Sequence, residues 1–254
     1  VAELRAQRIA DVWSSYRQLL RADDGLRAKL RALDFAGAAE LVQQFAARAD
    51  AQVVADRAVG VAALLQHAAR FSDALRRALT ADEVLLSLGD DTMRVVRWET
   101  DARQLVIVDS ERRGAREEPH PIDKLHLEQW YELADQVADA DRGSRECFLG
   151  LLALAEHARA GAAFLVRIDP KDDASGTGDA AYPYGSDVFD RLLVRLPNQG
   201  DAPWLPVAKQ ELQAGLHLAA GLRALSERRN LAAAGHIEKL LAEHPPSVRT
   251  ALPA

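Results

Sequence analysis

The stretch LRALDFAGAAELVQQFAARAD, residues 30–50, decides the fold because it holds two helical segments and the break between them. A Leu- and Ala-rich helix end is followed by a short polar break and then by the small residues Ala38 and Ala39. Residues 151–170 and 221–245 repeat this order. The corresponding small pairs are Ala162 with Ala163 and Ala233 with Ala234. Small residues let two helices approach closely, so the pattern predicts stacked helix pairs, which build surfaces rather than catalytic centres.

Apolar residues at three- and four-residue spacing predict helices along most of the chain. In the N-terminal part these cover residues 2–22, 26–33, 36–49 and 52–79. In the C-terminal part they cover residues 126–139, 145–159, 187–196, 207–225 and 231–243. We expect Gly60 to kink the long fourth helix and Gly161 to break the helix that precedes it. Asp141 and Ser144 are the expected N-caps of that helix.

Between the two helical regions the hydrophobic period changes to that of β-strands. Three short apolar runs, separated by polar turns, cover residues 84–89, 93–98 and 104–110. A fourth, at residues 117–122, is limited by Pro119 and Pro121. The runs predict an antiparallel meander or a small SH3-like barrel that leans on the flanking helices.

The expected fold class is therefore mainly α, of the α+β kind, with helical hairpins around a small inserted β unit. Residues 1–82 are expected to form an N-terminal helical bundle, and residues 83–125 the β unit. Residues 126–254 are expected to form a C-terminal helical region with repeat-like hairpins. Inside that region, residues 169–186 are rich in Asp, Gly, Ser and Pro, which predicts a long loop.

Composition limits the classes of function. The chain has 254 residues, of which 48% are hydrophobic and 28% charged, as in an ordinary globular protein. A net charge of −6 disfavours nucleic-acid binding, since proteins that hold phosphate backbones usually carry the opposite sign. The apolar runs are too short for a transmembrane helix, and the N-terminal stretch is not a signal peptide. We expect a cytoplasmic protein with no membrane span.

No motif in the chain predicts catalysis. None of the seven histidines has HExxH spacing, and neither a phosphate-binding Gly-rich loop nor a GxSxG elbow is present. His120 and His126 are close in sequence but would need a further converging ligand to hold a metal ion. The one cysteine, Cys147, fits a helix core. We expect no catalytic residue, no cofactor and no metal ligand.

Large aromatic residues are the candidate partner-binding residues. Tyr182, Tyr184 and Trp204 fall in Pro-containing irregular segments, and Trp98 falls in the arginine-rich β segment. Exposed aromatics of this kind anchor protein partners. The alternative is that they fasten their segments to the core, and Trp98 could equally line a peptide groove.

The quoted phrases resemble tetratricopeptide-type helical repeats, through the Ala-rich second helix and the closing prolines Pro170 and Pro245. The order of β segment, IDKL (residues 122–125), helix and repeat-like hairpin is also similar to non-catalytic regions of large multidomain bacterial proteins. Some of those regions are attached to eukaryote-like Ser/Thr kinases. The resemblance implies a protein-interaction or sensory module beside a catalytic domain that lies elsewhere.

The sequence thus predicts a non-catalytic interaction or scaffold module that binds a peptide or partner domain through helical faces and exposed aromatics. One alternative is an enzyme of unrecognised type, with its site near the β unit and residues 169–186. A second alternative is a nucleic-acid-binding β-barrel. Its candidate contacts are Arg94, Arg97, Arg103, Arg112, Arg113 and Arg116, among which acidic residues are interspersed.

Overall fold

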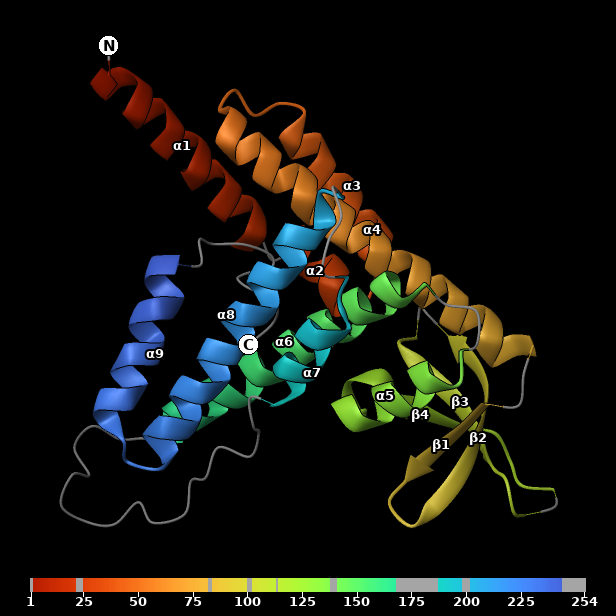
Figure 1. The fold of residues 1–254 in the computed structure, drawn as a ribbon. Coiled ribbons are helices and arrows are strands. Elements are labelled where there is room, and N and C mark those ends of the chain that lie inside the picture. The colour runs from red at the N-terminus through yellow and green to blue at the C-terminus, as the bar shows by residue number, and fades with distance from the viewer. Residues whose placement is uncertain are drawn as a thin grey trace. The chain divides into compact units, whose positions relative to one another are not determined.

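The computed structural model describes residues 2–21, 25–81, 84–99, 102–112, 114–137, 141–167, 187–197 and 202–243 (Figure 1). Most of them are helical. The helices of the N-terminal half are α1 (Ala2–Arg21), α2 (Leu26–Arg31), α3 (Phe35–Ala46) and α4 (Gln52–Ala81). Those of the C-terminal half are α5 (Leu127–Asp135), α6 (Arg142–Arg167), α7 (Asp187–Arg195), α8 (Trp204–Ser226) and α9 (Asn230–Glu243).

The strands are β1 (Val84–Leu88), β2 (Asp91–Glu99), β3 (Gln104–Asp109) and β4 (Glu118–Pro121), followed by a short 3-10 turn at Ile122–Lys124. They form one antiparallel sheet in the order β1-β2-β3-β4, so the described strands make an open meander rather than a closed barrel. The predicted fold class, mainly α with a small β meander, is confirmed.

The chain divides into two compact units. Unit 1 consists of Val1–Gln66 and Gly150–Ala254, and unit 2 of His67–Leu149. The chain passes from one unit to the other inside helices α4 and α6. Helices far apart in the sequence therefore share unit 1, and the strands share unit 2 with helical residues on both sides of them. The regions expected at residues 1–82, 83–125 and 126–254 follow sequence order, whereas these units follow packing.

Two of the three quoted phrases form a helix, a turn and a second helix. Asp34 caps α3 by accepting a hydrogen bond from the Gly37 amide (2.9 Å). The turn before α9 has Arg228 at φ 58°, with the Arg229 amide donating to the Ala224 carbonyl. The third phrase differs, because α6 continues through the expected break at Gly161. One glycine costs a helix interior only about 1 kcal/mol, and the surrounding alanines favour helix.

Close packing of α4 on α8 organises the core of unit 1. A Cβ built on Gly60 would lie 2.5 Å from Val207 Cγ2 and 2.9 Å from the Pro203 carbonyl oxygen. Gly60 therefore serves close approach inside the continuous helix α4. On the same helix, Arg57 donates to Glu211 on α8 (2.9 Å), with 10% and 2% of the two side chains exposed. Removing one partner would leave a buried charge uncompensated.

Unit 2 is held together by a run of aromatic contacts. Trp98 on β2 packs on Trp130 of α5, with ring centroids 5.6 Å apart. Trp130 in turn meets Phe148 of α6 edge-on (5.6 Å), and Phe148 meets Phe71 of α4 (5.2 Å). The Arg76 guanidinium lies over the Trp98 ring at 4.9 Å. Each aromatic pair adds about 0.5–1.5 kcal/mol beyond its buried area, so one face of the sheet is firmly committed to the helices.

We predict that Gly60→Ala destabilises the protein by about 1–3 kcal/mol, because the new methyl group meets a backbone oxygen that cannot move without shifting α8. Gly235→Ala on α9 is the matched control. Nothing lies within 4 Å of its added Cβ, so the better helix propensity of alanine should stabilise the protein slightly. Chemical denaturation measures both changes, and equal effects at the two positions would contradict the packing of α4 on α8.

The acid stability of unit 1 should depend on His157. Its ring is 1% exposed and packs against Phe189 at 4.8 Å, and burial lowers its pKa from 6.5 to about 4. Between these values the unfolded chain binds the proton and the folded chain does not. The stabilisation is therefore complete above pH 6.5 and is lost as the pH falls to about 4, by about 3 kcal/mol.

Unfolding free energies measured from pH 7 to pH 4 test this expectation. The His157→Gln variant should show a shallower decline than the unsubstituted chain, because carboxylates titrate alike in both and only the imidazole differs. Parallel curves for the two proteins would refute the role of His157.

Candidate partner-binding groove

Polar side chains of α5 take the place of a neighbouring strand along the free edge of β1. Gln136 donates to the Leu85 carbonyl (2.7 Å) and accepts from the Leu85 amide (2.9 Å). Gln129 donates to the Ser87 carbonyl (3.0 Å), and Glu132 accepts from the Ser87 amide and hydroxyl. The three side chains share one helix face because they are three and four residues apart. The outward backbone groups of β1 thus already have partners.

The opposite edge of the sheet is closed by prolines. Pro119 and Pro121 of β4 stand opposite Val106 and Gln104 of β3. Because proline has no N–H, the backbone donors from β4 to β3 must come from the residues that alternate with the prolines. The backbone nitrogens of both prolines therefore point away from β3. Neither edge therefore offers the alternating donors and acceptors that an added strand needs. The remaining candidate surface of this sheet is its face.

The face opposite the aromatic contacts carries a groove of about 490 Å³. Arg94 pairs with Val108 in the β2–β3 register, on the face away from Ile107, whose side chain is buried. A bulge between Val95 and Arg97 brings Val96 to the groove. The lining residues are Arg94, Val96, Val108, Asp109, Ser110, Arg112, Gly114, Ala115 and Glu117. The volume suits one or two side chains or a small ligand.

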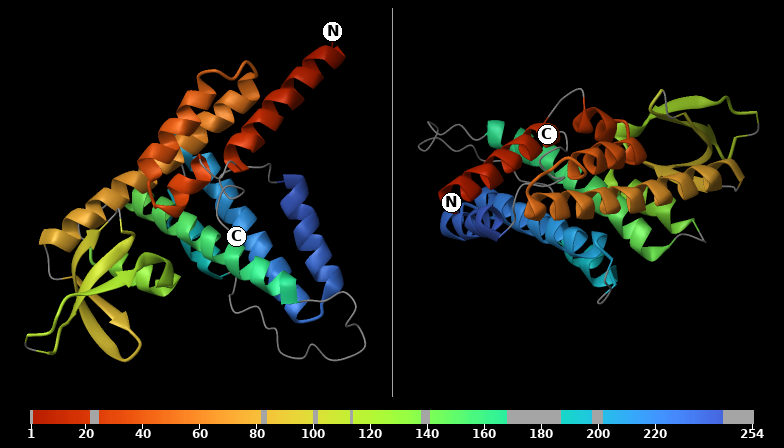
Figure 2. Two further views of the ribbon diagram at one scale, coloured as in Figure 1. Left: turned by 180° about the vertical axis from the view of Figure 1, so that it is seen from behind. Right: turned by 90° about the horizontal axis from the view of Figure 1, so that it is seen from above.

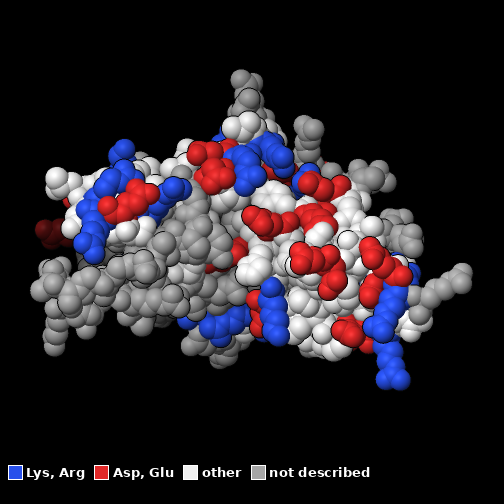
Figure 3. Space-filling model, turned by 90° about the horizontal axis from the view of Figure 1, so that it is seen from below, with Lys and Arg blue, Asp and Glu red and all other residues white. Residues whose placement is uncertain are grey.

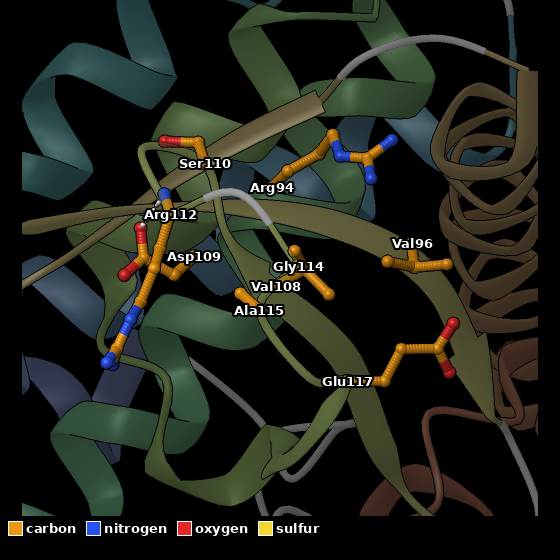
Figure 4. Close-up of a pocket in the computed structure, with 9 residues that line it drawn as sticks. All are labelled: Arg94, Val96, Val108, Asp109, Ser110, Arg112, Gly114, Ala115 and Glu117. Carbon is orange, nitrogen blue, oxygen red and sulfur yellow. Dashed lines mark hydrogen bonds between the residues drawn. The ribbon is translucent and has the colours of Figure 1, made fainter.

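The segment after β3 forms the wall of this groove. Asp109 accepts hydrogen bonds from the amides of Glu111 (2.9 Å) and Arg112 (3.2 Å), which turns the chain back. Ser110 is fixed on the Thr92 carbonyl through both its amide (3.2 Å) and its hydroxyl (2.6 Å). Figure 4 shows Asp109 and Arg112 at one end of the groove, Val96 and Glu117 at the other, and Val108 and Gly114 between them.

Two arginines of the groove are available to a ligand. Within the described residues, the guanidinium groups of Arg94 and Arg112 form neither an ion pair nor a hydrogen bond. The polar side chains beside them are already engaged. Glu117 accepts from Arg97 (2.7 Å), and Arg97 also donates to Glu99 (2.9 Å), so its pKa is raised above the ordinary value chiefly by the bond to Glu117. The groove thus combines two guanidinium groups, unpaired within the described part of the chain, with two valine side chains.

The aromatic residues expected to bind a partner have different environments. Trp98 is half-buried in the aromatic contacts of unit 2, on the sheet face away from the groove. Trp204 begins α8 and is 8% exposed. Trp204 is therefore largely buried, and Trp98 exposes only part of its side chain. Tyr182 and Tyr184 lie outside the described residues, as does the expected loop at residues 169–186. A partner-binding role for these four residues stays a prediction.

One serine, one histidine and one aspartate meet near the start of α6. Ser144 Oγ donates to Asp141 (2.9 Å) and lies 3.0 Å from His67 Nδ1. In a catalytic triad the histidine stands between serine and aspartate, whereas here the serine stands between the other two. Asp141 also accepts from the Ser144 amide (3.2 Å), so the group caps α6, as expected for Asp141. Burial lowers the pKa of His67.

The other residues considered for catalysis or metal binding are buried or lie on different elements. Cys147 is 3% exposed, and burial raises the pKa of its thiol. His120 lies on β4, where burial lowers its pKa, while His126 precedes α5. Among the described residues, no three His, Cys, Asp or Glu side chains gather as metal ligands would.

The face shown in Figure 3 carries charge of both signs. Lys and Arg side chains lie mainly toward its margins, next to Asp and Glu, and Asp and Glu side chains predominate in its middle. Within unit 2 the acidic partners of Arg97 neutralise one of the arginines proposed for nucleic-acid contacts. Arg113, another of them, lies outside the described residues. None of the helices among the described residues has the length and apolar character needed to cross a bilayer.

Comparisons of the chain with family models, with curated proteins and with solved structures found no match. The groove is consequently characterised by its own geometry. Sequence reasoning named Arg94 and Arg112 only for the nucleic-acid alternative. Arg97 is distinguished from them by its ion pair with Glu117. Glu117 is twenty residues away in the chain, so this pairing can be recognised only once the fold is known.

We predict that the Glu132→Ala/Gln136→Ala double variant associates with itself more strongly than the unsubstituted chain. The variant leaves Leu85 and Ser87 backbone groups open, and open strand edges pair with one another. Sedimentation velocity over a range of protein concentrations measures the association. Gln66→Ala, on the exposed face of α4, is the control and should not change it. An unchanged sedimentation profile in the double variant would show that α5 does not protect the edge.

Proposed function

We propose that the chain is a non-catalytic protein-interaction module whose groove in unit 2 binds an acidic segment of a partner protein. The observation that carries the proposal is a pair of guanidinium groups, Arg94 and Arg112, that have no ionic or hydrogen-bonding partner among the described residues and lie around the valine side chains of the groove. The interaction mode differs from the one expected from the sequence, which relied on exposed aromatics.

The chemistry of the groove favours carboxylates with an apolar residue between them. A guanidinium group presents a planar fork of donors that matches a carboxylate in bidentate fashion. Val96 and Val108 offer apolar contact but no hydrogen bond. An acidic segment could therefore place a carboxylate at each arginine and a small apolar side chain on the valines. Since both sheet edges are closed, such a segment would bind through its side chains rather than as an added strand.

A protein segment fits this groove better than a phosphate backbone does. Asp109 and Glu117 line the same groove as the two arginines. A nucleic acid carries evenly spaced negative charges and would meet these carboxylates, whereas a peptide can place its charges only where the arginines are. The helices of unit 2 contribute by holding the opposite face of the sheet, which keeps the groove preformed.

Selection from a phage-displayed library of short peptides tests the proposal, with the Arg94→Gln/Arg112→Gln double variant as the counter-selection target. We predict enrichment of peptides that place Asp or Glu on both sides of a small apolar residue. Their affinity should fall by about tenfold or more for each arginine replaced, since a hydrogen bond to a charged group contributes about 1.5–3 kcal/mol. It should also fall as salt is raised.

Arg116→Gln is the matched control, because Arg116 is an exposed arginine of the same segment and does not line the groove. It should leave peptide affinity unchanged. Equal binding to the chain and to the double variant, or no enrichment of acidic peptides, would refute the proposal. Binding of a single-stranded oligonucleotide that requires both arginines would instead favour the nucleic-acid alternative.

A further inference from the structure

Helices α8 and α9 of unit 1 approach each other closely. They run side by side in Figure 1 and in the left panel of Figure 2. A Cβ built on Gly221 would lie 3.5 Å from both His236 Cβ and Ile237 Cγ1, which is ordinary van der Waals contact. Ala233 is 1% exposed in the same interface. The small residues bring the two backbones near enough for side chains one turn away to meet.

Two histidines face each other across this interface. His217 of α8 and His236 of α9 have their Nδ1 atoms 3.5 Å apart, and their ring centroids are 5.8 Å apart at an interplanar angle of 40°. Both rings are half-buried. His217 precedes Gly221 by one helical turn, so the close approach of the helices fixes the spacing of the rings.

The separation of the two nitrogens matches that of ligands on one metal ion. A zinc–imidazole bond measures about 2.0–2.1 Å, and a tetrahedral angle then places two ligand nitrogens about 3.3 Å apart. A hydrogen bond between two neutral imidazoles is poor at 3.5 Å, because good N–H donors lie at about 2.9–3.0 Å from their acceptors. A divalent cation would instead receive the lone pairs of both nitrogens.

We propose that His217 and His236 form a two-histidine site for a divalent transition-metal ion of the zinc class. Imidazole suits zinc, copper and nickel and does not suit magnesium. Two protein ligands are one fewer than the three of open catalytic zinc sites, so the ion would complete its coordination with water or with another molecule. A bound ion would link α8 to α9. The site belongs to unit 1 and the peptide groove to unit 2, so either proposal can fail without the other.

Zinc titration of the whole chain tests the site, by isothermal calorimetry and by thermal unfolding with and without ZnCl₂. We expect binding of one ion and a zinc-dependent rise in Tm. His217→Gln and His236→Gln should each weaken zinc binding by an order of magnitude or more and abolish the rise in Tm. The double variant should lose little beyond either single change, because both ligands serve one ion.

His126→Ser is the matched control, since it removes an exposed histidine and leaves a good helix N-cap in its place. It should retain zinc binding, and MgCl₂ should stabilise none of the proteins. Zinc binding that survives in the His217→Gln/His236→Gln double variant would place the ion elsewhere and overturn the proposal. So would the absence of zinc binding in the unsubstituted chain, or a loss of binding that simply adds between the two single variants.

Discussion

The packing of Trp98 on Trp130 is the interaction on which the architecture of unit 2 depends. Through Phe148 and Phe71 it extends to two more helices, so one face of a small sheet acquires a core that four short strands could not supply alone. The other face carries the groove. The polar side chains of α5 occupy the β1 edge, and the prolines of β4 interrupt the backbone donors of the opposite edge.

Much of the fold could be predicted from periodicity, because helices and strands leave different spacings of apolar residues. The four strands and helix α8 lie close to the positions that the pattern predicts. The glycines could not be interpreted in this way. Gly161 continues a helix that local chemistry suggested it would end, and Gly60 makes room for Val207 and Pro203. Such roles depend on tertiary neighbours, which a local pattern does not contain.

The candidate sites were harder to predict than the fold. Among the described residues, Arg97 has acidic partners whereas Arg94 and Arg112 have none, and that difference arises from strand register and the segment after β3. The residue type of Trp98 and Trp204 predicts partner anchors, but it does not show that Trp98 is half-buried and Trp204 largely buried. His217 and His236 are separated by nineteen residues, a spacing that matches no ligand motif, and only the approach of α8 and α9 brings them together.

We propose above all that the groove in unit 2 receives carboxylates. Its most direct test is a titration of the ¹⁵N-labelled chain with a short peptide that carries two glutamates around an alanine, followed by amide chemical shifts in two-dimensional NMR spectra. We predict saturable shifts at Val96, Val108 and Ser110, which disappear as salt is raised. Shifts confined to residues outside the groove, or none at peptide concentrations that saturate binding, would contradict it.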